Sequence, residues 1–347
     1  MVSAKIFPLL ALAASAQAQV STKLSSKGCA DSSGLEKCQS TANDKTSACI
    51  AQARKDNSQE EILACSCADY VSNYNCFASH CWNRVWECEY QDYMVGYFKN
   101  CFSAKTPVPY FPAPDNVADA CSCNLGKVFD AIESAIQENT ACSNAASSGT
   151  DAGSNLQKMQ GCSCCAIGGS IGALAEICPE TNPKLIGLNE INQVEQNLNV
   201  DYPNCGPYLE QFNCVSDLGF SLNGVSKYFG PSDPLTTGTN TLSNGGGTVT
   251  APASGAVFTY TNGGDSQVYT ITAANFNSRG SSGGSGSGSG SGSDSSSESD
   301  SSQSASASAT GSSSNDNHKG AAGQLNSNRS YLIVAAWLIV ALTCLSL

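Results

Sequence analysis

Histidine and basic residues are scarce in this chain. Its 347 residues include two histidines, His80 and His318, and 17 Lys and Arg against 29 Asp and Glu, for a net charge of −12. Two isolated histidines give little support to Ser-His-Asp hydrolysis or to metal catalysis by several histidines. An acidic chain is also a poor ligand for nucleic acid, whose binding requires neutralised phosphates. We therefore predict no nucleic-acid partner.

Sequence signatures of catalysis are missing as well. There is no Gly-rich phosphate loop, no nucleophile elbow and no HExxH motif. Acid pairs such as Glu60/Glu61 and Glu87/Glu89 are available for glycoside hydrolysis, which needs two carboxyl groups across a cleft, but spacing alone does not place them so. His80 is interpreted as a histidine beside a disulfide rather than as a ligand or general base. We predict no catalytic residue, no metal and no cofactor.

The two ends of the chain are apolar. In residues 1–18, Lys5 precedes a short apolar run that closes on Ala16-Gln17-Ala18, the layout of a secretory signal peptide. Residues 331–347 are apolar and uncharged, and a polar spacer and the small triplet Gly320-Ala321-Ala322 precede them. Small site, polar spacer and apolar tail are the parts of a GPI-attachment signal. We predict attachment at Gly320, with Asn317 and Asn326 as rivals, and removal of 321–347.

Cysteine is abundant, with 19 residues, and only Cys344 lies in the C-terminal segment. Secretion would place the other eighteen in an oxidising compartment, where nine disulfides are the default. The stretch "GCSCC" at 161–165 is then part of a disulfide framework rather than a zinc site. The predicted disulfide cysteines are Cys29, Cys38, Cys49, Cys65, Cys67, Cys76, Cys81, Cys88, Cys101, Cys121, Cys123, Cys142, Cys162, Cys164, Cys165, Cys178, Cys205 and Cys214.

The tripeptide Cys-Ser-Cys recurs at 65–67, 121–123 and 162–164, which predicts three related units within a cysteine-rich domain over 19–230. The surrounding pattern is helical, and two cysteines of Cys-x-Cys on a helix point about 200° apart, toward different neighbours. Ser58 and Glu61 predict a capping box. Asp115 is expected to cap a helix that runs through 121–123. Two apolar stripes support further helices: Leu125, Val128, Phe129, Ile132 and Ile136, and then Leu188, Ile191, Val194 and Leu198.

Residues 231–277 contain no cysteine. Alternating apolar and polar residues around "NGGD" predict a β-hairpin, which either docks on the helical domain or belongs to an extended stalk. Residues 278–320 are mostly Ser and Gly and read as a disordered tether whose serines suit O-linked sugar. The predicted fold is mainly α and disulfide-rich, with a possible small β-hairpin.

The most aromatic stretch is 81–102. Its rings recur at helical spacing, and an exposed ladder of this kind would stack on sugar rings. The other interpretation, which we favour, is a core face that packs on disulfides. The candidate binding surface consists of Trp82, Trp86, Tyr90, Tyr93 and Tyr97.

Signal peptide, cysteine-rich head, Ser/Gly tether and C-terminal signal together resemble fungal GPI-anchored cell-surface and cell-wall proteins. Cys65-Ser66-Cys67, followed by Cys76 and Cys81, is also similar to the centre of the fungal CFEM domain, some members of which bind haem. That family places an axial Asp three residues before Cys-x-Cys, where this chain has Ile62.

We therefore expect an extracellular, GPI-anchored surface protein with a structural, adhesive or host- and wall-contact role. Its partners would be the membrane, through the anchor, and wall glucan or chitin. A CFEM-like haem- or iron-binding protein and a polysaccharide-modifying hydrolase are the alternatives.

Overall fold

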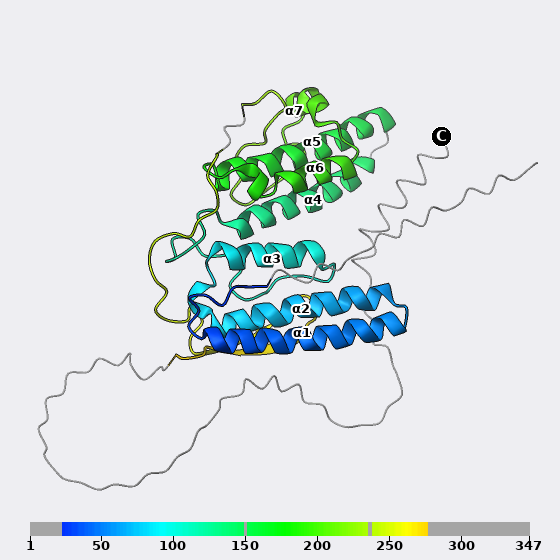
Figure 1. Ribbon diagram of the computed structural model, residues 1–347. Helices are drawn as coiled ribbons and strands as arrows, with labels where there is room; N and C mark the ends of the chain where they lie inside the picture. The colour runs from blue at the N-terminus through cyan, green and yellow to red at the C-terminus, as the bar shows by residue number, and fades with distance from the viewer. Residues whose placement is uncertain (1–22, 149–150, 235–237, 277–347) are drawn as a thin grey trace, which may run out of the picture.

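The computed structural model describes residues 23–148, 151–234 and 238–276. In this part of the chain there are seven α-helices and one two-stranded antiparallel sheet (Figure 1). The prediction of a mainly helical, disulfide-rich fold with a small β-hairpin is confirmed. The predicted signal peptide (1–18), tether (278–320) and C-terminal segment (321–347), together with Gly320, lie outside the described residues.

The helices form two antiparallel hairpins with α3 between them (Figure 1). α1 packs on α2 in the first hairpin, and α4 packs on α5 in the second, where α6 and α7 cover α5. The helices are α1 (Ser32–Lys55), α2 (Gln59–His80), α3 (Cys88–Asn100), α4 (Leu125–Ser147), α5 (Ala152–Ile177), α6 (Leu188–Asn197) and α7 (Gly206–Gln211). Short 3-10 helices cover Trp82–Arg84, Pro183–Leu185 and Tyr202–Cys205.

Local sequence explains most helix starts. Ser58 accepts a hydrogen bond from the backbone N–H of Glu61 at 3.2 Å, which confirms the N-cap half of the predicted capping box. The Ser58 N–H donates to the backbone oxygen of Ala53 at 2.9 Å instead of to the Glu61 side chain. Asp151 caps α5 in the same way. Both predicted apolar stripes are helical and face the core, with Leu125, Val128 and Ile191 buried.

The prediction of a helix from Asp115 through 121–123 is wrong. α4 starts at Leu125, and its cap is Asn124. Upstream, Asn116 and Asp119 have positive φ angles of 58°. The backbone at 119–122 instead bonds to residues 243–246. A tertiary contact therefore overrides the local helical pattern.

The disulfides reveal a repeat of two units rather than three. In each hairpin one bridge closes the open end and one ties the facing helices, while a third fastens the second cysteine of Cys-Ser-Cys to a downstream element. The same pairing order occurs in both units, and Cys121-Ser-Cys123 lies in the loop between them. The matching bridges are Cys29–Cys81, Cys49–Cys65 and Cys67–Cys101 in the first unit, and Cys123–Cys178, Cys142–Cys162 and Cys164–Cys205 in the second.

Three further bridges have no counterpart in the other unit. They are Cys38–Cys76 within the first hairpin, Cys88–Cys121 in the connection and Cys165–Cys214 in the second unit. All eighteen predicted cysteines are thus paired. In both helical Cys-Ser-Cys motifs the two cysteines bond to different elements, as the helical geometry predicted.

The C-terminal segment 238–276 crosses from the second unit back to the first (Figure 1). Asn240 pairs with the backbone at 180–182, and residues 243–246 pair with 119–122. β1 (Val257–Thr261) and β2 (Val268–Thr272) then form the hairpin. We call residues 238–256 the strap; its backbone hydrogen bonds connect the 180–182 backbone of the second unit to the 119–122 loop between the units.

The hairpin docks on α2, which resolves the alternatives of a docked hairpin and a stalk. Tyr260 donates to Asn75 at 2.6 Å, and Asn262 bonds to the hydroxyl of the buried Tyr74. The turn fits closely, because a Cβ at Gly263 would lie 2.1 Å from the backbone oxygen of Thr106. Glycine is therefore required where the turn meets the 103–107 loop.

Candidate functional site

The aromatic ladder in 81–102 belongs to the core, as the favoured interpretation of the sequence held, and these five residues are not an exposed binding surface. Trp82, Trp86, Tyr90, Tyr93 and Tyr97 are each at most 7% exposed. Their rings lie in the core where α2, α3 and the β-hairpin meet. The helical spacing of these aromatic residues therefore identified a buried face.

Polar atoms of two of these rings, Tyr90 and Trp82, have hydrogen-bond partners inside the fold. Tyr90 donates to the backbone oxygen of Pro109 at 2.8 Å, and Trp82 donates to that of Ala274 at 2.9 Å. Burial raises the pKa of the Tyr90 hydroxyl well above its ordinary value, so it stays a donor. The ladder therefore stabilises the fold and offers no face to a sugar.

His80 ends α2 beside Cys81 and pairs with the cap of α1. Its Nδ1 lies 2.8 Å from Oδ2 of Asp31. The hydroxyl of Ser33 also donates to Asp31, at 3.2 Å. The carboxylate is therefore the central group, with the hydroxyl on one side and the imidazole on the other, whereas the imidazole is central in a catalytic triad. This order differs from a Ser-His-Asp triad. The contact matches the structural interpretation of His80.

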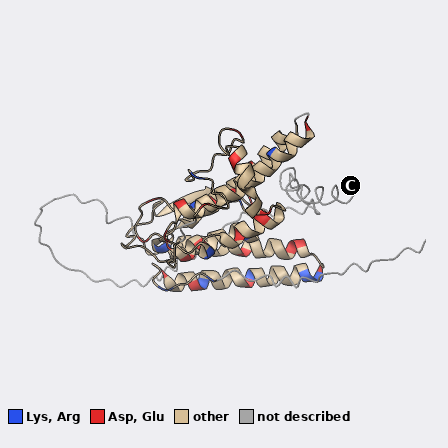
Figure 2. Cartoon of the chain, turned by 90° about the horizontal axis from the view of Figure 1, so that it is seen from above, with Lys and Arg blue, Asp and Glu red and all other residues tan. Residues whose placement is uncertain are grey.

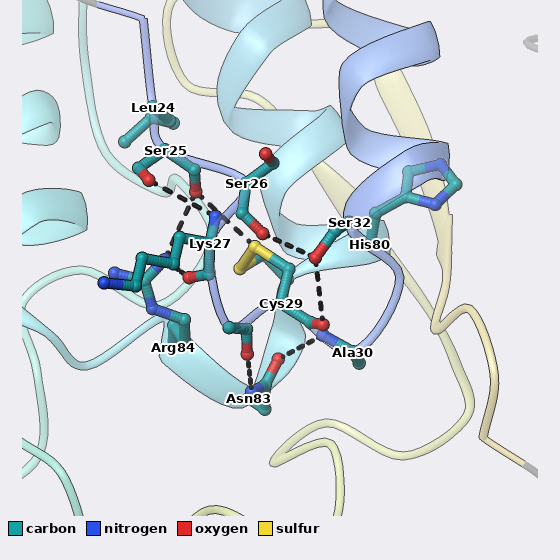
Figure 3. Close-up of a disulfide and its surroundings, with 12 residues drawn as sticks. Leu24, Ser25, Ser26, Lys27, Cys29, Ala30, Ser32, His80, Asn83 and Arg84 are labelled. Atoms are coloured by element: carbon teal, nitrogen blue, oxygen red, sulfur yellow. Dashed lines mark hydrogen bonds between the residues drawn. A yellow bond between two sulfur atoms is a disulfide. The ribbon is translucent and has the colours of Figure 1, made fainter.

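The residues around Cys29 hold the start of the described chain in place (Figure 3). Arg84 donates to the backbone oxygens of Ser25 and Lys27, and Asn83 donates to that of Gly28. The His80 ring points away from this group in the same view.

The acid pairs considered for glycoside hydrolysis do not face each other across an open space. Arg84 binds Glu87 through two nitrogens, at 2.8 and 2.6 Å, and also contacts Glu89 at 3.0 Å. Burial, followed by a hydrogen bond to Glu87 and its charge, raises the pKa of the Asp119 carboxyl. Because the Arg84 guanidinium bridges the carboxylates of Glu87 and Glu89, no sugar fits between them. Glu60 and Glu61 lie in the exposed first turn of α2.

The "GCSCC" cysteines are buried disulfides. Cys162 bonds to Cys142, and the adjacent Cys164 and Cys165 bond to Cys205 and Cys214. Within the described residues, no group of three or more His, Cys, Asp or Glu side chains is arranged to hold a metal ion.

The outer face of the β-hairpin is a candidate contact surface that the sequence reading did not identify. Strand residues alternate, so that Phe258, Tyr260, Tyr269 and Ile271 turn inward. The signal available was the pair of Thr-x-Thr motifs, "TYT" and "TIT". The six outward residues, all exposed, are Val257, Thr259, Thr261, Val268, Thr270 and Thr272. We call these six residues the hairpin face.

The hairpin face is uncharged and pairs in register. Thr259 lies opposite Thr270, with their Oγ1 atoms 3.3 Å apart, and each valine lies opposite a threonine. Val257 and Val268 are 58% and 66% exposed. Hydroxyls and methyl groups side by side suit a neutral, hydroxyl-rich partner rather than a charged one.

Comparison with known proteins adds no relative: no protein-family model, no curated protein and no solved structure matches this chain. Among the described helices, none is both long and apolar enough to span a bilayer.

Proposed function

We propose that this chain is a GPI-anchored extracellular protein of the cell surface or wall, with a structural or adhesive role. The observation that carries the proposal is the pairing of all eighteen cysteines between Cys29 and Cys214 into nine disulfides. Disulfides at this density persist in oxidising compartments and resist unfolding outside the cell. That compartment agrees with the N-terminal signal and C-terminal attachment pattern of the sequence.

The path of the chain supports a tethered head. Asn275, near the end of the described chain, donates to the backbone oxygen of Ala30 at 3.0 Å. The described chain therefore ends beside the residues where it begins. The tips of the two helices α1 and α2, near 55–59, lie at the other end of that hairpin.

For the adhesive role we propose the hairpin face as the contact with neutral wall polymer, glucan or chitin. The aromatic ladder is buried, and the hairpin face offers threonine hydroxyls and valine methyl groups to solvent. Hydroxyls exchange hydrogen bonds with sugar hydroxyls, and methyl groups cover the apolar side of a sugar ring.

Two separate measurements test the proposal. In the first, full-length protein on the producing cell is treated with phosphatidylinositol-specific phospholipase C, which is expected to release it into the medium. Protein that stays bound to membranes after this treatment and after wall digestion would contradict the GPI anchor. Secreted protein is then incubated with particulate glucan and chitin. The double substitution Thr259→Ala with Thr270→Ala is expected to weaken retention several-fold.

The matched control for the hairpin variant is Thr41→Ala with Thr140→Ala, two exposed threonines on helices. It should bind as the unsubstituted protein does. Equal retention of both variants would refute the hairpin face as the contact while leaving the anchor result untouched.

A further inference from the structure

Charge is distributed unevenly over this acidic protein. Residues 23–55 carry six Lys and Arg against three Asp and Glu, whereas residues 56–276 carry seven against 22. The first helix and the segment before it are thus cationic on an otherwise anionic molecule (Figure 2). The six cations are Lys23, Lys27, Lys37, Lys45, Arg54 and Lys55.

These cations are not neutralised by the fold. All six side chains are exposed, and within the described residues none of them forms an ion pair. Elsewhere Arg84, Lys99, Lys127 and Lys227 each pair with a carboxylate. An exposed, unpaired lysine or arginine destabilises the fold little, because water solvates its charge. Such a cation needs no partner within the protein and is available to a ligand.

Two of the three carboxylates in residues 23–55 form hydrogen bonds within the protein. Asp31 is held by His80 and by the N-terminus of α1, and Glu36 accepts a hydrogen bond from Ser26 at 2.6 Å. Asp44 is exposed beside Lys45 and is the one carboxylate of 23–55 with no described partner. The outer side of α1 therefore keeps a cationic excess along its length, and the exposed acids Asp56, Glu60 and Glu61 lie beyond its last turn.

Helix geometry places three of the lysines on one outer stripe. Leu35, Ala42 and Ala53 face α2 and are buried. Lys37 and Lys55 are separated by five turns and point in the same direction, away from that buried side. Lys45 lies about 80° around the helix from them, still in solvent. We call Lys37, Lys45 and Lys55 the lysine stripe.

The spacing of the stripe distinguishes among polyanions. Along α1 the three lysines are about 12 and 15 Å apart, at 1.5 Å rise per residue. Duplex nucleic acid carries a charge about every 1.7 Å, far denser than this stripe, and the surrounding acidic surface would repel it. A polysaccharide with one anionic group every few sugar units matches the spacing.

An anionic membrane fits less well. Helices that lie on lipid bury an apolar face at the interface. Within the described residues, no large exposed hydrophobic side chain precedes Leu63, so α1 has none to insert. From charge, spacing and the lack of an apolar edge on α1, we infer that the lysine stripe binds an anionic polysaccharide, sulfated, phosphorylated or carboxylated.

The test uses the secreted chain and, as the probe, partly methyl-esterified polygalacturonate with one free carboxylate every few sugar units, with the fully esterified polymer as the uncharged comparison. The unsubstituted protein should bind the partly esterified polymer with an affinity that falls as salt rises, and should not bind the fully esterified one. The variant K37E/K45E/K55E is expected to bind at least about tenfold more weakly, with a salt slope smaller by about 2 to 3.

The matched control is K105E/K158E/K184E, which changes the net charge equally at three other exposed lysines without an ion pair among the described residues. It should keep its affinity within about twofold. K37Q/K45Q/K55Q gives a second reading of the stripe should charge reversal impair folding, which circular dichroism reports.

Three results would overturn the inference: no binding of partly esterified polygalacturonate by the unsubstituted protein at low salt, equal losses in the stripe and control variants, or tighter binding to vesicles of phosphatidylserine and phosphatidylcholine than to this polysaccharide. Because the soluble chain and a charged probe are used, failure of the anchor or of neutral-glucan binding would leave this result unchanged.

Discussion

His80 and Asp31 join the two ends of the first helical hairpin, with Nδ1 of the imidazole 2.8 Å from Oδ2 of the carboxylate. Asp31 begins α1 and His80 ends α2, next to the Cys29–Cys81 bridge. The backbone of Asp31 also donates to the His80 oxygen at 2.9 Å. One residue pair therefore caps a helix and closes the hairpin.

This contact predicts acid-dependent stability. Burial raises the pKa of the Asp31 carboxyl, but hydrogen bonds from the Gly34 N–H and from His80 outweigh it and lower the pKa below 3.8. A depressed pKa means stability that is present above the unfolded value and is lost as pH falls through the folded one. Asp31→Asn keeps a capping side chain but removes the charge that faces His80, so it should reduce the free energy of unfolding by about 1 kcal/mol at neutral pH and flatten its decline below about pH 4.

Denaturant unfolding at a series of pH values measures this effect. Asp44→Asn, on the exposed side of the same helix, should retain the acid dependence of the unsubstituted protein. An Asp31→Asn profile with an undiminished decline in acid would disprove the role of the pair.

The disulfide framework predicts a defined peptide map. Non-reducing digestion should yield the "GCSCC" peptide linked to three others, which contain Cys142, Cys205 and Cys214. The denatured, unreduced secreted protein should weigh 18 hydrogens less than its reduced form, as nine bridges require. A Cys164–Cys165 bridge or free thiols would contradict the pairing.

Asn262 is predicted to hold the hairpin on the helical domain. It is fully buried, caps its own turn by accepting from Gly264 and Asp265, and contacts Tyr74. Asn262→Ala should cost about 2–3 kcal/mol, because several buried hydrogen bonds are lost together. Hydrogen exchange should then rise most in β1 and β2.

The comparison for Asn262 is Asn43→Ala, an exposed asparagine on α1. It should leave stability and exchange within about 0.5 kcal/mol of the original. Unchanged exchange in the hairpin of Asn262→Ala would show that the strap and strands dock without this side chain.

Trp86 separates a core role from a binding role for the aromatic ladder. Trp86→Ala should lower the free energy of unfolding by about 3–5 kcal/mol, since the side chain is 6% exposed and packs edge-on against Tyr110. Phe102→Ala, at a ring that is 65% exposed, should change it little. Glucan and chitin retention by folded Trp86→Ala should equal that of the unsubstituted protein, and a selective loss of retention would restore the ladder as a contact surface.

Local features of the fold were predictable where sequence neighbours decide them. The Ser58 cap, the stripe that begins at Leu125 and the β-hairpin around 262–265 depend on periodicity and turn chemistry. The start of α4 could not be predicted from local sequence, because the backbone at 119–122 forms hydrogen bonds with residues 243–246, more than a hundred positions later.

For the disulfides and the candidate surfaces too, the sequence predicted some features and left others to the tertiary structure. Composition, together with the predicted signal peptide, indicated a disulfide framework, because an even number of cysteines in an oxidising compartment has one usual fate. Which cysteine pairs with which, and that the repeat has two units, depend on how the hairpins stack. Periodicity marked one face of the 81–102 ladder but could not say whether water or α2 lies against it. That distinction, like the exposure of Thr259 and of Lys37, depends on which other elements cover a face, and only tertiary packing decides this.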